Sequence, residues 1–163
     1  MNAFRRSCAL RILMMGLLLP AASLSCFASL GRAPTAFPAA GTSAVRAHVL
    51  AAGAGANPGA AGYTVNSSVL DNGTTVREYV GADGVVFAVS WNGPFLPDLR
   101  TLLGDHFATL TSEAARHPKA GHSQLHVDRP EVTIESTGHM RAYAGRAWIN
   151  ARLPAGFKPG DIE

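Results

Sequence analysis

The hydrophobic and polar positions fall into a regular pattern from Tyr63 onward. "YTVNSSVL" alternates apolar and polar residues, as a half-buried strand does. Asn72-Gly73 then predicts a tight hairpin turn, because both positions tolerate a positive φ. "TVREYV" predicts a second strand, Asp83-Gly84 a second turn, and "VVFAVSW" a third strand. The segment from Tyr63 to Trp91 is therefore predicted to be an antiparallel meander of three strands.

Strict alternation in the third strand has a consequence for its aromatic residues. It places Phe87, Val89 and Trp91 on one face, with Ala88 and Ser90 on the other. We therefore expect Trp91 to pack in the core rather than to stack against a ligand.

The apolar positions change to a helical period after Pro97. Pro97 suits the first position of a helix, and Asp98 places a negative charge in its first turn. The apolar residues at helical spacing are Leu99, Leu102, Leu103, Phe107, Leu110 and Ala114. Pro118 ends the pattern, so an amphipathic helix over residues 97–116 is predicted to cover the apolar face of the sheet. Gly104 inside this helix costs about 1 kcal/mol relative to Ala, so it either marks a close contact with the sheet or is a tolerated defect.

The rest of the chain predicts further strands and an irregular tail. Strands are expected in "SQLHVDR", "EVTIES" and "HMRAYAGRAWIN", and the tail "LPAGFKPGDIE" carries two prolines and two glycines. Residues 63–163 are therefore predicted to form one compact domain of the α+β class. It is expected to contain an antiparallel sheet of five or six strands, to begin with the three-strand meander, and to have one principal amphipathic helix.

The N-terminal segment has the layout of a secretory signal peptide. Three arginines precede an apolar run over residues 12–19, and a proline and small residues follow. Cys26 and Ala28 occupy the small-residue positions of a cleavage site. The apolar run is too short for a membrane-spanning helix, which needs about 20 apolar residues. We therefore expect residues 1–28 to be a signal peptide, and the protein to be exported to the periplasm or the cell exterior.

Two variants of export stay open. Arg5-Arg6 suggests twin-arginine export, although Cys8 stands where a bulky apolar residue is usual. Cys26 is a candidate for lipidation, although the residues before it lack an aliphatic side chain at the outer position. A lipid on Cys26 would anchor the mature protein to the membrane. Otherwise we expect membrane contact only through the signal peptide.

Residues 29–62 differ in composition from the domain that follows. Twelve Ala, six Gly and three Pro occupy these 34 positions. Such a stretch has few large apolar groups to bury, so it cannot offset the entropy cost of ordering itself. We expect a flexible lead in which His48 is solvated, with a short helix around Ser43 to Ala52 as the alternative.

Cleavage changes the charge of the chain. The 163 residues have a formal net charge of +3. The signal peptide takes three of the 14 basic residues and none of the 11 acidic ones, so the mature chain has no net charge. A neutral protein has no long-range field that gathers phosphate backbones, so we expect no nucleic-acid partner. Cys8 and Cys26 also leave, which excludes thiolate catalysis, disulfides and thiolate metal sites.

Two long stretches resemble a known bacterial family. They are "LDNGTTVREYVGADGVVFAVSWNGPFLPDLRTLLG" and "STGHMRAYAGRAWINARLPAGFKPGDIE". Their most specific pieces are "VREYV", "W-x-G-P-x-x-P-D-L", "G-H-M-R-A" and "LPAG". Through these pieces, the chain from about Tyr63 to Glu163 is similar to the family called domain of unknown function 2844. The resemblance implies an exported protein and supplies no activity, cofactor or site residue.

The histidines raise the question of a metal site. His117, His122 and His126 lie within ten residues, and imidazole suits zinc or copper. Their spacing matches no compact zinc pattern, so a polar loop that contains histidines is the preferred interpretation, and no cofactor is expected. A small periplasmic carrier that uses histidines to hold a metal or ligand stays an alternative. His106 falls on the apolar side of the predicted helix, where we expect a hydrogen-bonded core histidine.

The most suggestive polar pattern lies in the last predicted strand. A period of two places His139, Arg141 and Tyr143 on one face. An imidazole, a guanidinium and a phenol in a row form a candidate binding face for a carboxylate or a glycan. The alternative is a solvated face with cross-strand pairs, for example to Glu78 or Glu135.

No sequence motif supports catalysis. The chain has no nucleophile elbow, phosphate-binding loop or dinucleotide fingerprint. The sequence therefore predicts an exported, non-catalytic binding or interaction module of the envelope or periplasm. Its partner is expected to be an unknown protein, glycan or envelope component. A hydrolase without a recognisable motif stays a further alternative.

Overall fold

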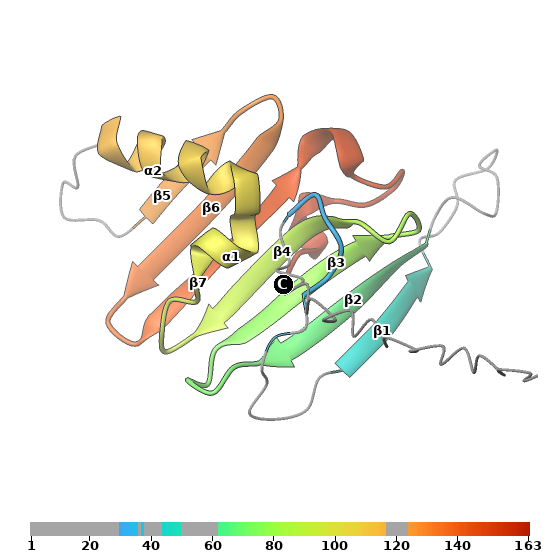
Figure 1. Ribbon diagram of the computed structural model, residues 1–163, viewed down its shortest axis with the longest axis horizontal. Coiled ribbons are helices and arrows are strands. Elements are labelled where there is room, and N and C mark those ends of the chain that lie inside the picture. Colours follow the sequence, from blue (N-terminus) through green and yellow to red (C-terminus); the bar gives the residue numbers. More distant parts are fainter. Residues whose placement is uncertain (1–29, 36, 38–43, 50–61, 117–123) are drawn as a thin grey trace, which may run out of the picture.

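The computed structural model describes residues 30–35, 37, 44–49, 62–116 and 124–163. Within them, the chain forms a seven-stranded antiparallel sheet with its two α-helices on one side (Figure 1). The strands are β1 (Ala44–Val49), β2 (Gly62–Val69), β3 (Thr75–Gly81), β4 (Val86–Gly93), β5 (Gln124–Asp128), β6 (Val132–His139) and β7 (Ala142–Ile149). The helices are α1 (Leu99–Leu103), η1 (Gly104–His106), α2 (Phe107–Arg116), η2 (Asn150–Arg152) and η3 (Pro159–Asp161).

The strand order of the sheet shows which predictions of the fold are confirmed and which are wrong. The order is β1-β2-β3-β4-β7-β6-β5, and all neighbours are antiparallel. The α+β class, the antiparallel sheet and the principal helix are confirmed. The predicted strand number is wrong, because the sheet has seven strands rather than five or six. The N-terminal meander has four strands rather than three, because β1 adds to β2.

β1 comes from the stretch for which composition predicts a flexible lead. The helix considered around Ser43 to Ala52 is wrong, because residues 44–49 pair with β2 along a full antiparallel ladder. Leu30 is also buried, and its amide donates to the carbonyl of Leu102 at 3.1 Å. These described parts of residues 29–62 belong to the fold, because backbone pairing and one buried leucine supply what the composition lacks. The predicted signal peptide, with Cys8 and Cys26, lies outside the described residues.

The principal helix is interrupted at Gly104. Asp98 caps α1, and its carboxylate accepts from the amides of Arg100 and Thr101 at 3.0 and 3.3 Å. Gly104 then adopts a φ of +51°, which side chains with a Cβ rarely tolerate, and it ends α1. Gly104 is therefore required by the change of helix direction. His106, in the η1 turn after it, is half-buried, so the prediction of a core histidine is wrong.

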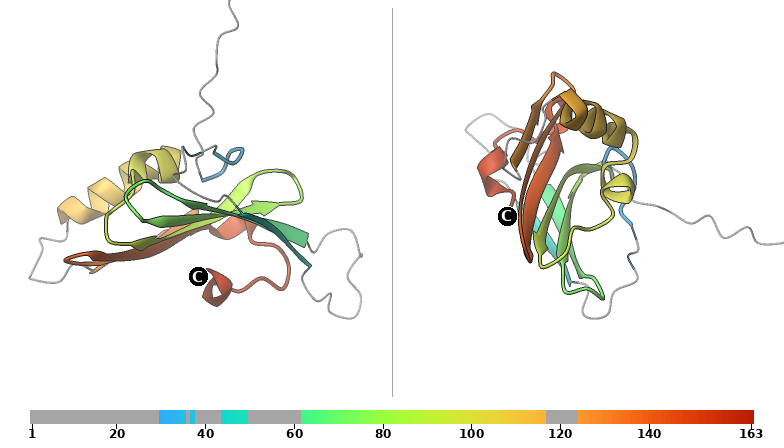
Figure 2. Two further views of the ribbon diagram at one scale, coloured as in Figure 1. Left: turned by 90° about the horizontal axis from the view of Figure 1, so that it is seen from below. Right: turned by 90° about the vertical axis from the view of Figure 1, so that its left-hand side faces the viewer.

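The sheet has two differently covered faces (Figure 2). α1, α2 and residues 30–35 lie over the face that we call the helix face, and residues 150–163 cross the opposite face, which we call the tail face. The buried core of the helix face consists of Leu30, Val76, Val80, Val86, Val89, Trp91, Leu102, Leu103, Leu110, Val127, Val132, Ile134 and Ala147. The buried core of the tail face consists of Val65, Tyr79, Phe87, Ala88, Trp148, Phe157 and Ile162.

An irregularity in β4 separates two aromatic residues that strict alternation places together. The β3–β4 register shifts between Tyr79 and Val80, so Phe87 and Ala88 both belong to the tail-face core. Trp91 packs in the helix-face core, as expected, but Phe87 does not share its face. Trp91 lies directly over Gly145 of β7, where an added Cβ would come within 2.2 Å of the indole.

Candidate functional site

A row of polar side chains crosses the tail face. Each member is the direct cross-strand partner of the next, so their side chains point to the same side of the sheet. This polar row consists of Ser67, Arg77, Ser90, Arg146, Glu135 and His126, from β2 to β5. It lies beside the aromatic residues of the tail-face core, so the two halves of this face differ in chemistry.

The C-terminal residues lie over the middle of the polar row. Arg77 Nη1 donates to the main-chain oxygen of Glu163 at 3.0 Å, and the Ser90 hydroxyl donates to the same oxygen. The Glu163 amide donates to the Tyr79 hydroxyl at 2.9 Å. Arg146 Nη1 donates to the carbonyl of Pro159 at 2.9 Å. The row therefore supplies hydrogen-bond donors to main-chain oxygens of the C-terminal segment, which is not part of the sheet.

An aromatic cluster fixes the same segment to the sheet. Phe157 meets the rings of Tyr63 and Phe87 edge-on, with centroids 5.2 and 5.0 Å apart, and lies 6.0 Å from Tyr79. Such edge-to-face contacts add to the free energy gained by burying the rings. The end of the chain is thus held by ring contacts at Phe157 and by hydrogen bonds at Glu163.

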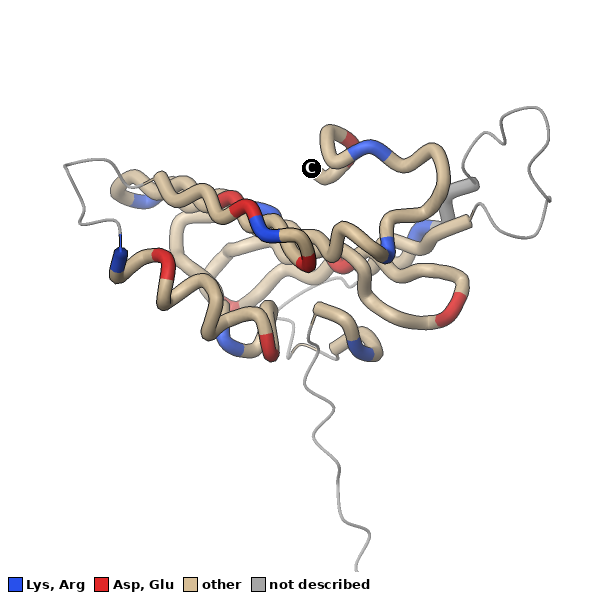
Figure 3. Tube along the Cα trace, turned by 90° about the horizontal axis from the view of Figure 1, so that it is seen from above, with Lys and Arg blue, Asp and Glu red and all other residues tan. Residues whose placement is uncertain are grey.

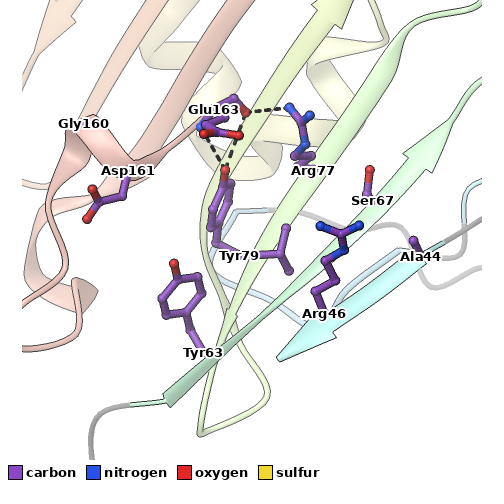
Figure 4. Close-up of a pocket in the computed structure, with 10 residues that line it drawn as sticks. Ala44, Arg46, Tyr63, Ser67, Arg77, Tyr79, Gly160, Asp161 and Glu163 are labelled. Atoms are coloured by element: carbon purple, nitrogen blue, oxygen red, sulfur yellow. Dashed lines mark hydrogen bonds between the residues drawn. The ribbon is translucent and has the colours of Figure 1, made fainter. Parts of the chain in front are cut away.

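A pocket opens between the C-terminal segment and β1, β2 and β3 (Figure 4). Its volume is about 560 Å³, within the range of small-molecule sites. Its polar lining comes from Arg46, Tyr63, Ser67, Arg77, Tyr79, Asp161 and Glu163. Figure 4 shows Arg46, Ser67 and Arg77 projecting from three adjacent strands toward the side of the sheet where Glu163 lies.

The pocket contains two cationic groups in different situations. Arg77 is half-buried and donates to Glu163, whereas Arg46 is exposed on the edge strand. Among the described residues, no side chain or carbonyl pairs with the guanidinium of Arg46. Burial raises the pKa of Tyr63, and the nearby Tyr79, Asp161 and Glu163 raise it further. The phenol of Tyr63 therefore stays protonated near neutral pH and can donate a hydrogen bond.

Comparison with known proteins gives a family and no activity. The family model described as "Protein of unknown function (DUF2844)" matches residues 26–162. The chain belongs to this family. No curated protein and no solved structure matches it. The resemblance over about Tyr63 to Glu163 is thus confirmed, and the DUF2844 match extends toward the N-terminus to include β1 and Leu30.

The predicted binding face of His139, Arg141 and Tyr143 does not exist as one strand face. β6 ends at His139 and β7 begins at Ala142, so the chain turns at Met140 and Arg141. His139 pairs with Ala142, and Tyr143 pairs with Gly138, which places His139 and Tyr143 on opposite faces. Arg141 lies in the turn with a φ of 62°. The expectation that the three side chains share one strand face is wrong, because a two-residue turn without Gly, Asn, Asp or Pro gives no sequence signal.

The two predicted cross-strand acids also have other roles in this DUF2844 protein. Glu135 pairs with Arg146 at 2.6 Å, and His126 Nδ1 lies 3.6 Å from its other oxygen. Glu78 is on the helix face, only 2% exposed, and accepts from the Thr35 amide at 3.1 and 3.3 Å. Burial raises the pKa of Glu78 to about 7, against the opposing effect of these hydrogen bonds.

The histidines give no metal centre within the described part of the chain. No group of three His, Cys, Asp or Glu residues there is arranged to hold an ion. His126 is exposed and lies beside Glu135, while His117 and His122 fall outside the described residues. The same part of the chain contains no helix long and apolar enough to cross a membrane.

Sequence reasoning missed the residues that the pocket brings together. Arg46 lies in the stretch interpreted as a lead, and Glu163 in the tail interpreted as irregular. Ser67 and Arg77 are polar positions of correctly predicted strands, and alternation alone could have placed them on one face. Only the tertiary fold shows that the C-terminal segment crosses that face.

Proposed function

We propose that this DUF2844 protein is an exported, non-catalytic binding module of the envelope or periplasm, whose ligand enters the tail-face pocket. The observation that supports this proposal is the Arg46 guanidinium, which lines the pocket and has no partner among the described residues. Asp161 and Glu163 also line the pocket, so the preference for a negatively charged ligand group rests on Arg46 itself, beside Arg77.

The pocket is suited to ligand recognition because the strand ladders and the aromatic cluster fix the residues that line it. Arg46, Ser67 and Arg77 stand on adjacent strands of one sheet, so their spacing is set by the strand ladders. The Tyr63 and Tyr79 rings pack in the aromatic cluster that Phe157 closes. A preformed site loses little conformational entropy when its ligand binds.

The expected export of the protein is compatible with an acidic ligand. The signal-peptide layout of residues 1–28 favours export, where acidic sugars, small organic acids and acidic protein segments are available partners. Charge on the described chain is mixed, and Figure 3 shows basic and acidic residues interspersed along it. Such a surface gathers no polyanion by long-range attraction, so anion recognition would depend on the pocket itself.

A titration with two related sugars tests the proposal. We expect galacturonate to bind the purified exported chain more tightly than galactose, which lacks its carboxylate. Arg46→Gln should weaken galacturonate binding roughly tenfold, because a hydrogen bond to a charged group contributes about 1.5 kcal/mol or more. Arg152→Gln is the matched control, because Arg152 pairs with Asp83 at 2.9 Å outside this pocket.

Isothermal titration calorimetry measures the affinities for galacturonate, galactose and galactose 6-phosphate. Galactose 6-phosphate is included as a second anionic sugar, because galacturonate is a probe for a ligand that is not identified. The proposal is contradicted if neither anionic sugar binds better than galactose. It is also contradicted if Arg46→Gln and Arg152→Gln bind the anionic sugars equally well.

A further inference from the structure

The main-chain oxygen of Glu163 has an unusual set of donors. Arg77 and Ser90 both donate to it, and the Tyr79 hydroxyl lies 3.5 Å away. Ser90 is 2% exposed and Tyr79 is 3% exposed, and Arg77, Tyr79 and Glu163 itself line the pocket. Three side chains from two adjacent strands thus converge on one oxygen.

This donor set matches a carboxylate. A guanidinium and hydroxyls supply charge-assisted hydrogen bonds, which are about twice as strong with an ionised acceptor as with a neutral one. A ligand carboxylate oxygen also has the planar geometry of the Glu163 main-chain oxygen that occupies the site. Buried hydroxyls need an acceptor, so a group that displaces Glu163 has to supply an oxygen in the same place.

We propose that Arg77, Ser90 and Tyr79 form a carboxylate subsite, and that the main chain of Glu163 is an internal occupant which a carboxylate ligand displaces. This inference rests on the proposed function, because it names the ligand group recognised in the same pocket. Glu163 can leave without unpacking the segment, since Ile162 and Phe157 stay buried in the tail-face core. Arg146 still holds Pro159 when Glu163 moves.

The binding of the Glu163 main chain to the subsite can be weakened by a substitution that leaves Arg77, Ser90 and Tyr79 unchanged. Glu163→Pro removes the amide that donates to the Tyr79 hydroxyl. Ile162 has an extended backbone, with φ −82° and ψ 106°, which suits a residue before proline. Glu163→Gln is the matched control, because it removes the same side-chain charge from the pocket and keeps the amide.

The expected result is a difference between these two variants. Galacturonate should bind Glu163→Pro roughly 3- to 10-fold more tightly than Glu163→Gln, as the loss of one competing hydrogen bond implies. Ser90→Ala should weaken galacturonate binding in either background. In spectra of the isotope-labelled Glu163→Gln variant, saturating galacturonate should shift the amide signal of position 163. Thermal unfolding checks that every variant folds.

Each other outcome overturns a defined part of the account. Equal galacturonate affinity of Glu163→Pro and Glu163→Gln overturns the internal occupant, while the proposed function stands. If galactose 6-phosphate binds as tightly as galacturonate, the carboxylate subsite is overturned and the anion pocket stands. If neither anionic sugar binds any variant, the proposed function and this inference fail together.

Discussion

The two faces of the sheet use the same strands for different tasks. The helix face is closed by leucines of α1 and α2 over a continuous apolar core, and Leu103 is completely buried there. The tail face combines an aromatic cluster with the polar row, and its cover leaves a pocket of about 560 Å³. The helix face is therefore a closed apolar core, whereas the tail face also holds the pocket for which we propose ligand binding.

Successive residues of β3 point alternately to the helix face and to the tail face. Val76, Glu78 and Val80 point to the helix face, whereas Arg77 and Tyr79 point to the tail face. Because neighbouring positions of one strand serve opposite faces, their substitutions should have opposite consequences. Changes in the helix-face core should mainly lower the free energy of unfolding, and changes at the polar pocket residues of the tail face should mainly alter binding.

The largest expected effect lies in the helix-face core. Leu103→Ala should lower the free energy of unfolding by about 2–5 kcal/mol, because it leaves a cavity under the helix. Arg77→Ala on the tail face should lower it by about 1 kcal/mol or less. Urea denaturation measures both. Similar losses of unfolding free energy in the two variants would contradict the difference in stability expected between the two faces.

A second prediction tests the close contact between β4 and β7. Gly145→Ala should cost about 1–3 kcal/mol, because its Cβ would meet the Trp91 ring at 2.2 Å and the Glu135 carbonyl at 2.6 Å. Gly160→Ala is the control, since no atom lies within 4 Å of its added Cβ. Denaturation curves should separate the two variants. A neutral Gly145→Ala would show that the helix-face core is more plastic than its packing indicates.

A third prediction concerns the one buried carboxyl group of the described helix-face core. The pKa of Glu78 is raised from 4.5 to about 7 by burial, so the folded state binds more protons than the unfolded state between these pH values. Stability should therefore fall as pH rises through this window, by at most about 1.4 kcal/mol per pH unit.

The variant Glu78→Gln should remove this dependence. Unfolding free energies of wild type and Glu78→Gln are measured from pH 4 to pH 8, and their difference isolates the carboxyl group. Parallel curves, or a wild-type stability that rises relative to the variant, would contradict the assigned burial of Glu78.

The smallest expected effect is at the start of α1. Asp98→Ala should cost about 1 kcal/mol, because the carboxylate accepts from the Arg100 and Thr101 amides. The Thr101 hydrogen bonds lower the pKa of Asp98, so this contribution is present above the ordinary carboxyl pKa and is lost as pH falls. Asp105→Ala removes an exposed pair with Arg32 and should cost less. Thermal unfolding at pH 7 and pH 3 compares them, and equal costs at pH 7 would sink the capping argument.

Local chemistry explains which parts of the fold were predictable. Asn72-Gly73 and the alternation around it specify the β2–β3 hairpin, and Pro97-Asp98 specifies the start of the helix. β1 was not predictable, because its Ala-rich residues become a strand only through their ladder with β2. The β6–β7 turn was missed because Met140 and Arg141 are not turn formers, and Arg141 still adopts a left-handed φ.

The candidate site was harder to predict because it is assembled from distant segments. Arg46, Arg77 and Glu163 come from an edge strand, a central strand and the last residue described. No spacing in the sequence links them, since the C-terminal segment reaches the tail face only through the packing of Phe157. The sequence predicted a binding face of Arg and Tyr side chains in the last strand, whereas the pocket proposed here brings together Arg and Tyr residues of β1, β2 and β3.

One titration tests the central claim that the tail face binds ligand while the helix face holds the fold. Amide signals of the isotope-labelled protein are followed as galacturonate is added. The account predicts saturable shifts confined to the tail-face pocket, at Arg46, Ser67, Arg77, Tyr79 and Glu163, with α1 and α2 unaffected. Shifts that concentrate on the helices, or no saturable shift with either anionic sugar, would contradict it.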